Sequence, residues 1–444
     1  MKLTILLFTP LIAFSQNSSS SADDLLQDVR TRSPLALQTF QQYATASNPT
    51  LQQAQSYVKQ SAALSHQAGL YPNPSVGYQG EQIRGGSYGG GEQGAFVQQN
   101  IVLGGKLRLR RNVFEQQRRE DEFTLAEQRY RIQGDVGQSF YAALAAQEIV
   151  NVRQRLLVLA RDAVETAHQL ANVGQADAPD VLQAEVEADQ AAIDYTKAQR
   201  TFLQSFAELS ALAGQPNLPV SPLQGDLEHP AQIDTAKLPE STLRDSPEVK
   251  RARQALLHAQ AELKSARRES IPDLQLRGGV QQNSEPLSPL TVGVQGFATV
   301  GVSLPIFNRN QGNVAAAQAE VERAHSELNR LELRLRQSIQ VPLQAYLSGR
   351  FEADRYRDQM IPRAEGAYHL YLAKYRQMGA AYPQVLISQR TLFQLQVGYI
   401  NALASVWMNS IALQNYLLSS GLSSPDVNGS YTTTVNTPNT GINQ

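Results

Sequence analysis

The chain repeats one order of residues at a spacing of about 200 positions. The stretch from Val173 to Leu182 contains Val-Gly followed by Pro-Asp-Val-Leu, and the stretch from Met378 to Leu386 contains Met-Gly followed by Pro-Gln-Val-Leu. Other segments match at the same spacing, so two diverged copies of one unit are the simplest explanation. The chain must therefore fold twice into the same arrangement of helices and strands.

Each copy is predicted to contain a helix, two strands joined by a turn, a very long helix, a tight turn and a returning helix. The long helices are expected at residues 106–172 and 311–377, each on the order of 100 Å long at about 1.5 Å per residue. Their apolar residues recur at spacings of three and four among charged ones, which is typical of coiled coils. Pro342 breaks helical hydrogen bonding and Gly137, at the equivalent position, is a weak helix former, so we expect a bend there in both copies.

Four short segments alternate apolar residues with small or polar ones: residues 75–82, 94–103, 274–281 and 297–304. A membrane wall between lipid and water requires such alternation, although an ordinary half-exposed hairpin shows it too. Four strands cannot close a barrel, since single-chain membrane barrels begin at about eight strands, and lipid does not tolerate an open sheet edge. If the strands lie in a membrane, several chains must therefore share one barrel.

The remaining segments follow from composition. Residues 1–16 combine a basic start, an apolar stretch too short to span a bilayer and small residues near their end, which predicts a signal peptide. Low periodicity with many prolines predicts a linker or equatorial segment at residues 215–245, between the copies. The boundaries expected for the rest are a linker at 17–34, the two repeats at 35–214 and 246–421, and a disordered tail at 422–444.

The composition excludes several classes of protein. The chain has no cysteine, so it offers neither a thiolate metal site nor a cysteine nucleophile. Its formal net charge of −1 argues against nucleic-acid binding through a basic surface. No catalytic triad or carboxylate pair stands out, and the six histidines lack the spacing of metal ligands: His66, His168, His229, His258, His325 and His369. We therefore predict no enzyme activity, no cofactor and no metal site.

With these features the chain resembles the TolC-type outer-membrane efflux channels. The resemblance covers about residues 35–421 and rests on the tandem repeat, the two turn phrases and the Gly104-Gly105-Lys106 step from strand to long helix. The second copy is most similar to the metal-efflux subgroup that works with resistance-nodulation-division pumps. The resemblance implies a mostly α-helical homotrimer with four membrane strands per chain, in which a 12-strand β-barrel in the outer membrane continues as a helical coiled-coil barrel through the periplasm.

The resemblance also implies a function and a site. The trimer would be the passive outer-membrane channel of a tripartite efflux system, carrying small molecules or cations outward from an inner-membrane pump with the help of a periplasmic adaptor protein. The coiled-coil ends would form an aperture that docks the adaptor. Candidate aperture residues are Gly174, Asp177, Asp180, Gly379, Tyr382 and Gln384.

In the family, acidic residues constrict this aperture, and Asp177 and Asp180 match that role. Asp180, beside Pro179, fits a helix N-cap equally well. Gln384 and Ile387 stand where the family has aspartates, so the resemblance supports no acidic ring from the second copy.

A periplasmic coiled-coil adaptor, or another structural protein of an export complex, is the alternative, because adaptors also contain long antiparallel helices. Adaptors usually carry one helical hairpin and many-stranded β-domains, whereas this chain has two hairpins and four strands. The channel is therefore the favoured interpretation, with outer-membrane lipid around its strands and no nucleic-acid partner.

Overall fold

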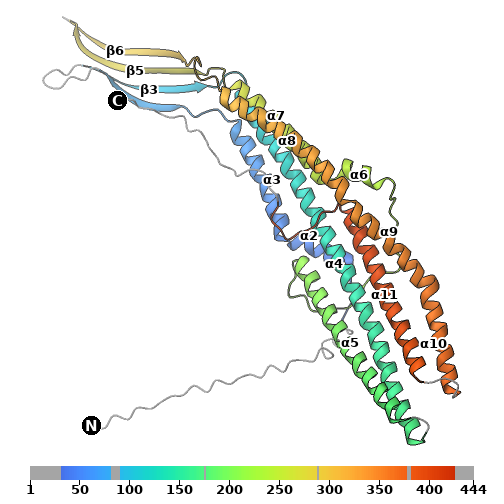
Figure 1. Cartoon of the computed structure of the whole chain (residues 1–444). Coiled ribbons are helices and arrows are strands. Elements are labelled where there is room, and N and C mark those ends of the chain that lie inside the picture. The colour runs from blue at the N-terminus through green and yellow to red at the C-terminus, as the bar shows by residue number, and fades with distance from the viewer. Residues whose placement is uncertain (1–31, 82–90, 175–176, 288–289, 378–381, 426–444) are drawn as a thin grey trace, which may run out of the picture.

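The computed structural model describes residues 32–81, 91–174, 177–287, 290–377 and 382–425. The expected signal peptide, nearly all of the linker at 17–34 and most of the tail at 422–444 lie outside the described residues. The described chain is an elongated helical rod with a β-sheet at one end (Figure 1).

Both copies contain the predicted order of elements, which confirms a mostly helical repeat. The first copy consists of β1 (Leu35–Ala36), α2 (Leu37–Ser47), α3 (Pro49–Ala68), β2 (Ser75–Glu81), β3 (Glu92–Ile101), α4 (Lys106–Asn172) and α5 (Ala178–Leu212). The second consists of β4 (Leu223–Gln224), α6 (Leu238–Asp245), α7 (Pro247–Arg268), β5 (Leu274–Leu287), β6 (Leu290–Val302), α8 (Gln311–Ser338), α9 (Gln340–Arg355), the π-helical turn η1 (Tyr356–Met360), α10 (Ile361–Arg376) and α11 (Tyr382–Gln414).

The four long strands form one antiparallel sheet in the order β2-β3-β5-β6. Successive side chains alternate between its faces. One face carries valines that are more than half exposed: Val76, Val97, Val280 and Val300. The other face carries Gln79, Phe96 and Arg277, with the Arg277 guanidinium 3.9 Å from the centre of the Phe96 ring. The sheet is thus apolar on one side and largely polar on the other.

The strands differ from the prediction at their ends: β5 continues beyond the expected 274–281 to Leu287, and β6 begins before the expected 297–304, at Leu290. β3 ends at Ile101 and β6 at Val302, although the alternating pattern continues in the sequence for two more residues. Ile101 and Val302 both pair with Leu274, the first residue of β5, which begins just after Pro272. Before Leu274 the chain of β5 offers no further strand residue, so the backbone pairing of β3 and of β6 with β5 ends at this residue.

The two long helical stretches are not equivalent. α4 runs unbroken through Gly137, whose missing side chain lets Ile411 of α11 approach to about 3.2 Å from where a Cβ would lie. In the second copy the helix breaks between α8 and α9, three residues before Pro342, which has no N–H to donate to the carbonyl of Ser338. The helix is therefore interrupted at the expected place in the second copy only, and the helix expected at 311–377 is a succession of four segments.

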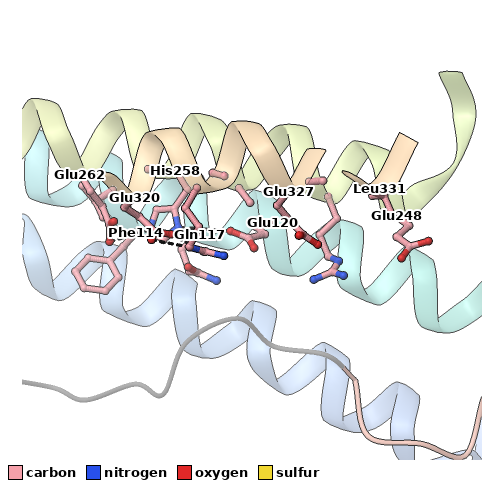
Figure 2. Close-up of a pocket in the computed structure, with 16 residues that line it drawn as sticks. Phe114, Gln117, Glu120, Glu248, His258, Glu262, Glu320, Glu327 and Leu331 are labelled. Atoms are coloured by element: carbon pink, nitrogen blue, oxygen red, sulfur yellow. Dashed lines mark hydrogen bonds and ion pairs between the residues drawn. The ribbon is translucent and has the colours of Figure 1, made fainter. Parts of the chain in front are cut away.

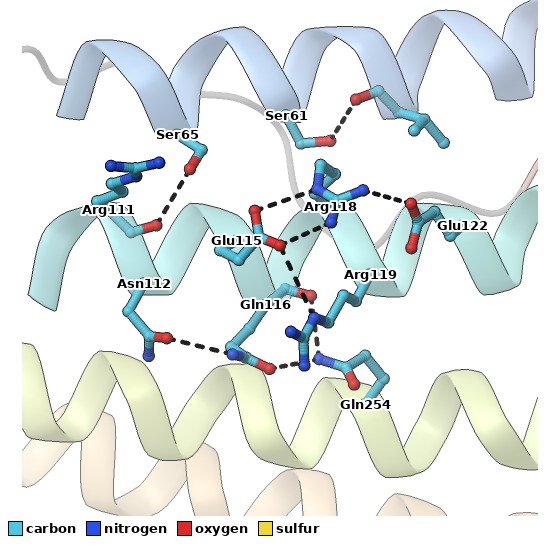
Figure 3. Close-up of polar contacts among 11 residues, drawn as sticks. Ser61, Ser65, Arg111, Asn112, Glu115, Gln116, Arg118, Arg119, Glu122 and Gln254 are labelled. Atoms are coloured by element: carbon cyan, nitrogen blue, oxygen red, sulfur yellow. Dashed lines mark hydrogen bonds and ion pairs between the residues drawn. The ribbon is translucent and has the colours of Figure 1, made fainter. Parts of the chain in front are cut away.

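Near the sheet, polar side chains hold α4 between α3 and α7. The Ser61 hydroxyl of α3 donates a hydrogen bond to the carboxylate of Asp121. On the other side, Gln254 of α7 donates to the carbonyl oxygen and the side-chain oxygen of Gln116, at 3.2 and 2.8 Å (Figure 3). Asp121 is 2% exposed, and burial raises its pKa above the usual range. The register of α4 against both neighbours is therefore set by specific polar pairs.

The largest apolar core lies in the middle of the rod. The rings of Phe40 and Phe140 are 6.0 Å apart and almost fully buried. Trp407 of α11 stacks on Tyr141 of α4 with ring centres 3.8 Å apart, and its Nε1 donates to the carbonyl of Leu227 at 2.9 Å. The segment between the copies, which was predicted as a linker, is thus packed onto this core.

Candidate functional site at the helical tip

The end of the rod away from the sheet contains the turn from α4 to α5 (Figure 1). Gly174 has φ of 72°, a left-handed conformation that glycine adopts without strain and that ends α4. Pro179 lies in the first turn of α5, where its missing N–H costs nothing. Two helices of the first copy therefore meet at this tip in a short, glycine-initiated turn.

The predicted aperture residues that the structure describes lie at this tip or at the adjoining start of α11. Gly174 and Asp177 are exposed, and Asp180 is half-buried in the first turn of α5. Tyr382 opens α11 and is only 9% exposed, whereas Gln384 beside it is exposed. Gly379 lies outside the described residues.

The N-cap interpretation of Asp180 is wrong. α5 begins at Ala178, so Asp177 occupies the N-cap position, and Asp180 is the third helical residue. The side chain of Asp177 makes no capping hydrogen bond. Asp177 and Asp180 therefore both lie at the N-terminal end of α5, where the helix dipole is positive, and neither carboxylate is used in a capping hydrogen bond.

Tyr382 packs the second copy against the first. It shares a buried cluster with Ala167, Val181 and Ala184 of the first hairpin, and its ring centre lies 5.4 Å from that of Tyr375. Burial, followed by the nearby Tyr375, raises the pKa of Tyr382 to about 12. Its hydroxyl is buried and finds no hydrogen-bond partner among the described residues, so Tyr382 itself joins the two hairpins by apolar packing.

Two ion pairs lie behind this cluster, along a cavity of about 390 Å³ between α4, α5 and α11. The Arg390 guanidinium of α11 pairs with the Glu187 carboxylate of α5. Arg153 of α4 pairs with Asp194 of α5 at 3.2 Å. The first pair links the returning helices of the two copies, whereas the second stays within the first copy.

Sequence reasoning did not identify the pair of Glu187 and Arg390. A signal was present, since the two residues follow the equivalent prolines Pro179 and Pro383 by eight and seven positions. Oppositely charged residues at nearly equivalent positions of the two copies can form an ion pair when the copies pack side by side.

A second polar cavity, of about 550 Å³, lies between α4, α7 and α8, nearer the sheet (Figure 2). His258 of α7 lies 3.5 Å from Glu120 of α4 and 3.6 Å from Glu262 one turn away. Burial opposes protonation of His258, but these carboxylates outweigh it, and the pKa of His258 is raised. Protonated His258 therefore links α4 to α7.

Among the residues that the structure describes, no three His, Cys, Asp or Glu side chains lie together as a metal site would require. Over the same part of the chain, none of the helices is both long enough and apolar enough to cross a membrane.

Comparison with known proteins places this architecture in a family context. The family model described as "Outer membrane efflux protein" matches residues 41–215 and 238–417. The cobalt-zinc-cadmium resistance protein CzcC of Cupriavidus metallidurans is 26% identical over 417 residues, which cover 94% of this chain and 97% of that protein. The toluene efflux pump outer membrane protein TtgC of Pseudomonas putida is 24% identical over 64% of this chain and 58% of its own length.

Solved structures share the fold. The crystal structure of CusC superposes with a TM-score of 0.71 at 18% identity, covering 86% of this chain and 92% of that one. The outer membrane protein VceC of Vibrio cholerae superposes with a TM-score of 0.69 at 17% identity, covering 87% and 96%. The observed rod with a terminal sheet is thus the fold of these proteins.

The link through His258 predicts that stability depends on pH. Because the pKa of His258 in the folded protein is raised above its ordinary value of about 6.5, the stabilisation is complete below about pH 6.5 and is lost as the pH rises through the raised pKa. The substitution H258Q should remove this loss of stability at higher pH. Thermal unfolding of the detergent-solubilised protein, followed by helical circular dichroism between about pH 5.5 and 8.5, measures it. H369Q, on the exposed face of α10, is the matched control, and parallel profiles for H258Q and wild type would contradict the link.

Proposed function

Because the chain belongs to the outer membrane efflux protein family, we propose that three copies form the outer-membrane conduit of a tripartite efflux system. The protein lies in the outer membrane, with its helical rod in the periplasm. The observation that carries the proposal is the sheet, which exposes one apolar face and two unpaired edges at one end of that rod.

The unpaired edges argue for assembly. Within the described residues, β2 and β6 each pair along one side only. A sheet edge in lipid leaves backbone N–H and C=O groups without partners, which is why membrane sheets close into barrels. Three copies of four strands would close a barrel of 12 strands, with the valine face toward lipid and the face of Gln79 and Arg277 toward water. The helices would then continue the wall into the periplasm.

The conduit would be passive, with energy supplied by an inner-membrane pump and an adaptor protein joining pump and channel at the tip. The relative that matches almost the full length is named for resistance to cobalt, zinc and cadmium. This supports a divalent cation as cargo, and the pump would be of the resistance-nodulation-division type. Such a cation would cross as substrate, without a resident site in the chain.

We propose that the tip is the periplasmic aperture, with Gly174, Tyr382 and Gln384 at the adaptor-docking turns. Asp177 and Asp180 would place negative charge around the mouth, where it concentrates cations. The pair of Glu187 and Arg390 would hold α11 against the first hairpin, so that opening separates α5 from α11. Exposed ion pairs contribute only about 0.2–1 kcal/mol, which suits a contact that must break during the transport cycle.

The assembly is tested by mass. Light scattering corrected for bound detergent should give the mass of three protomers for the protein extracted from outer membranes. A detergent-free soluble monomer would instead support the adaptor interpretation. The same samples should lose their β-sheet signal when heated into monomers, because the barrel needs all three chains.

The charge of the mouth is tested by single-channel recording. D177N/D180N should lower the preference for cations over anions and change the conductance, because the acidic residues raise the local cation concentration. D162N/D189N removes two exposed carboxylates from the sides of the same hairpin and should leave both quantities near wild type. Unchanged conductance and selectivity in D177N/D180N would refute the role of these aspartates.

The pair of Glu187 and Arg390 is tested in the same recordings. R390Q should raise the open probability by up to about fivefold, the equilibrium shift that corresponds to about 1 kcal/mol. The charge swap E187R/R390E should restore wild-type gating, since it rebuilds the pair. R253Q, which breaks the pair of Arg253 with Glu332 between α7 and α8 at 3.3 Å, is the control. Equal opening in R390Q, R253Q and wild type would contradict a latch at the tip.

A further inference from the structure

The junction between the sheet and the helices carries a surplus of positive charge. Three stretches border the sheet here, at residues 102–114, 264–273 and 303–314 (Figure 1). Together they contain eight lysine and arginine residues and two acidic ones. The end of α3 and the stretch that follows it to β2 add no Lys, Arg, Asp or Glu. The surplus therefore lies at the level where the helices meet the sheet.

Both acidic residues of the junction are already paired within the chain. Asp273 lies 2.6 Å from the ammonium of the buried Lys106, and Glu269 accepts two hydrogen bonds of 3.0 Å from Arg110. No carboxylate of the junction is left for the other basic residues. Among the described residues, five exposed arginines of the junction take part in no ion pair: Arg108, Arg111, Arg267, Arg268 and Arg309.

Large apolar side chains are exposed at the same level. Phe307 is 91% exposed, Leu304 69% and Ile306 61%, all in the six residues after β6. Tyr71, after α3, is 65% exposed and Leu103, after β3, is 40% exposed. Exposed apolar groups gathered at one level mark a surface that another apolar phase covers. We call these side chains, together with the five arginines, the junction belt.

We propose that the junction belt binds the phosphate groups of anionic phospholipids in the periplasmic leaflet of the outer membrane. The inference rests on the proposed function, because it needs the valine face of the sheet to be embedded in the bilayer directly beyond the belt. The apolar side chains would enter the acyl region, and the arginines would reach the headgroups. A guanidinium offers a fork of donors that matches phosphate, and it stays charged at any physiological pH.

A second copy of the chain fits the belt less well than lipid does. In a rotationally symmetric assembly, neighbouring copies meet at the same level, so each belt would face another stretch with the same basic surplus. The two acidic residues at this level are held by Lys106 and Arg110 of their own chain. Like charges without free partners repel, whereas a leaflet of anionic headgroups supplies the missing charge.

The test compares lipid retention by native mass spectrometry of the full-length protein. It is exchanged from detergent into mixed micelles that contain phosphatidylglycerol or phosphatidylcholine with identical acyl chains. Wild type should retain phosphatidylglycerol in preference, and added salt should weaken this preference. R108Q/R268Q/R309Q, with one change in each stretch, should reduce phosphatidylglycerol retention by on the order of tenfold to a hundredfold, because each arginine near an anionic surface contributes about fivefold. Retention of phosphatidylcholine should not change.

The control variant removes the same charge elsewhere. R161Q/R200Q/R363Q changes three exposed arginines of α4, α5 and α10 that form no ion pair in the described residues and lie far from the sheet, and it should retain phosphatidylglycerol like wild type. Equal retention of the two lipids by wild type would overturn the proposal. Loss of the trimer mass in R108Q/R268Q/R309Q would overturn it too, because the junction belt would then be a contact between subunits. Wild type that neither forms trimers nor conducts in either lipid would refute the proposed function instead, and the two failures are thus distinguishable.

Discussion

The rest of the structure depends on the unpaired edges of a sheet that exposes an apolar face. β2 and β6 each have one partner strand in the described chain, and Val76 and Val300 lie more than two-thirds exposed on the same face. In a bilayer every backbone donor and acceptor must find its partner within protein. A chain that brings four strands can satisfy this rule only with other copies. The tandem repeat sets the number of strands at four, since each repeat contributes one pair of strands and one helical hairpin.

The two copies have diverged in the continuity of their long helices. α4 is continuous over 67 residues, while its counterpart breaks before Pro342 and again at the π-helical turn of η1. At η1, Tyr356 lies over Gly398 of α11, where a Cβ would come within 2.9 Å of the tyrosine hydroxyl oxygen. The long helix of the first copy is thus continuous, whereas its counterpart in the second copy is segmented. The segmented second copy is also the copy that supplies Tyr382 and Arg390 at the tip.

Much of this architecture could be predicted from the sequence, because repeats and periodicity report on backbone geometry. The order of strands and helices, the long helix α4 and the turn at Gly174 follow from local patterns that tertiary contacts did not override. The bend predicted at Gly137 failed because a glycine in a helix either weakens it or admits a neighbour, and here Ile411 takes the space. The pair of Glu187 and Arg390 escaped prediction because residues 203 positions apart meet only after the copies pack. The N-cap at Asp177 depended on which residue of a short turn begins the helix, which sequence alone fixes poorly.

The ion pairs along the rod differ in burial, and they therefore differ in how firmly they hold the helices. Between the sheet and the central core, Glu127 of α4 is 3% exposed and lies 2.5 Å from Arg131 and 3.0 Å from Arg251 of α7. Removing one partner of such a buried pair costs about 3–5 kcal/mol, so the helices there cannot slide without a large penalty. At the tip, Arg390 is 56% exposed, and its pair is worth at most about 1 kcal/mol. The ion pairs therefore hold the helices more firmly along the body of the rod than at its tip.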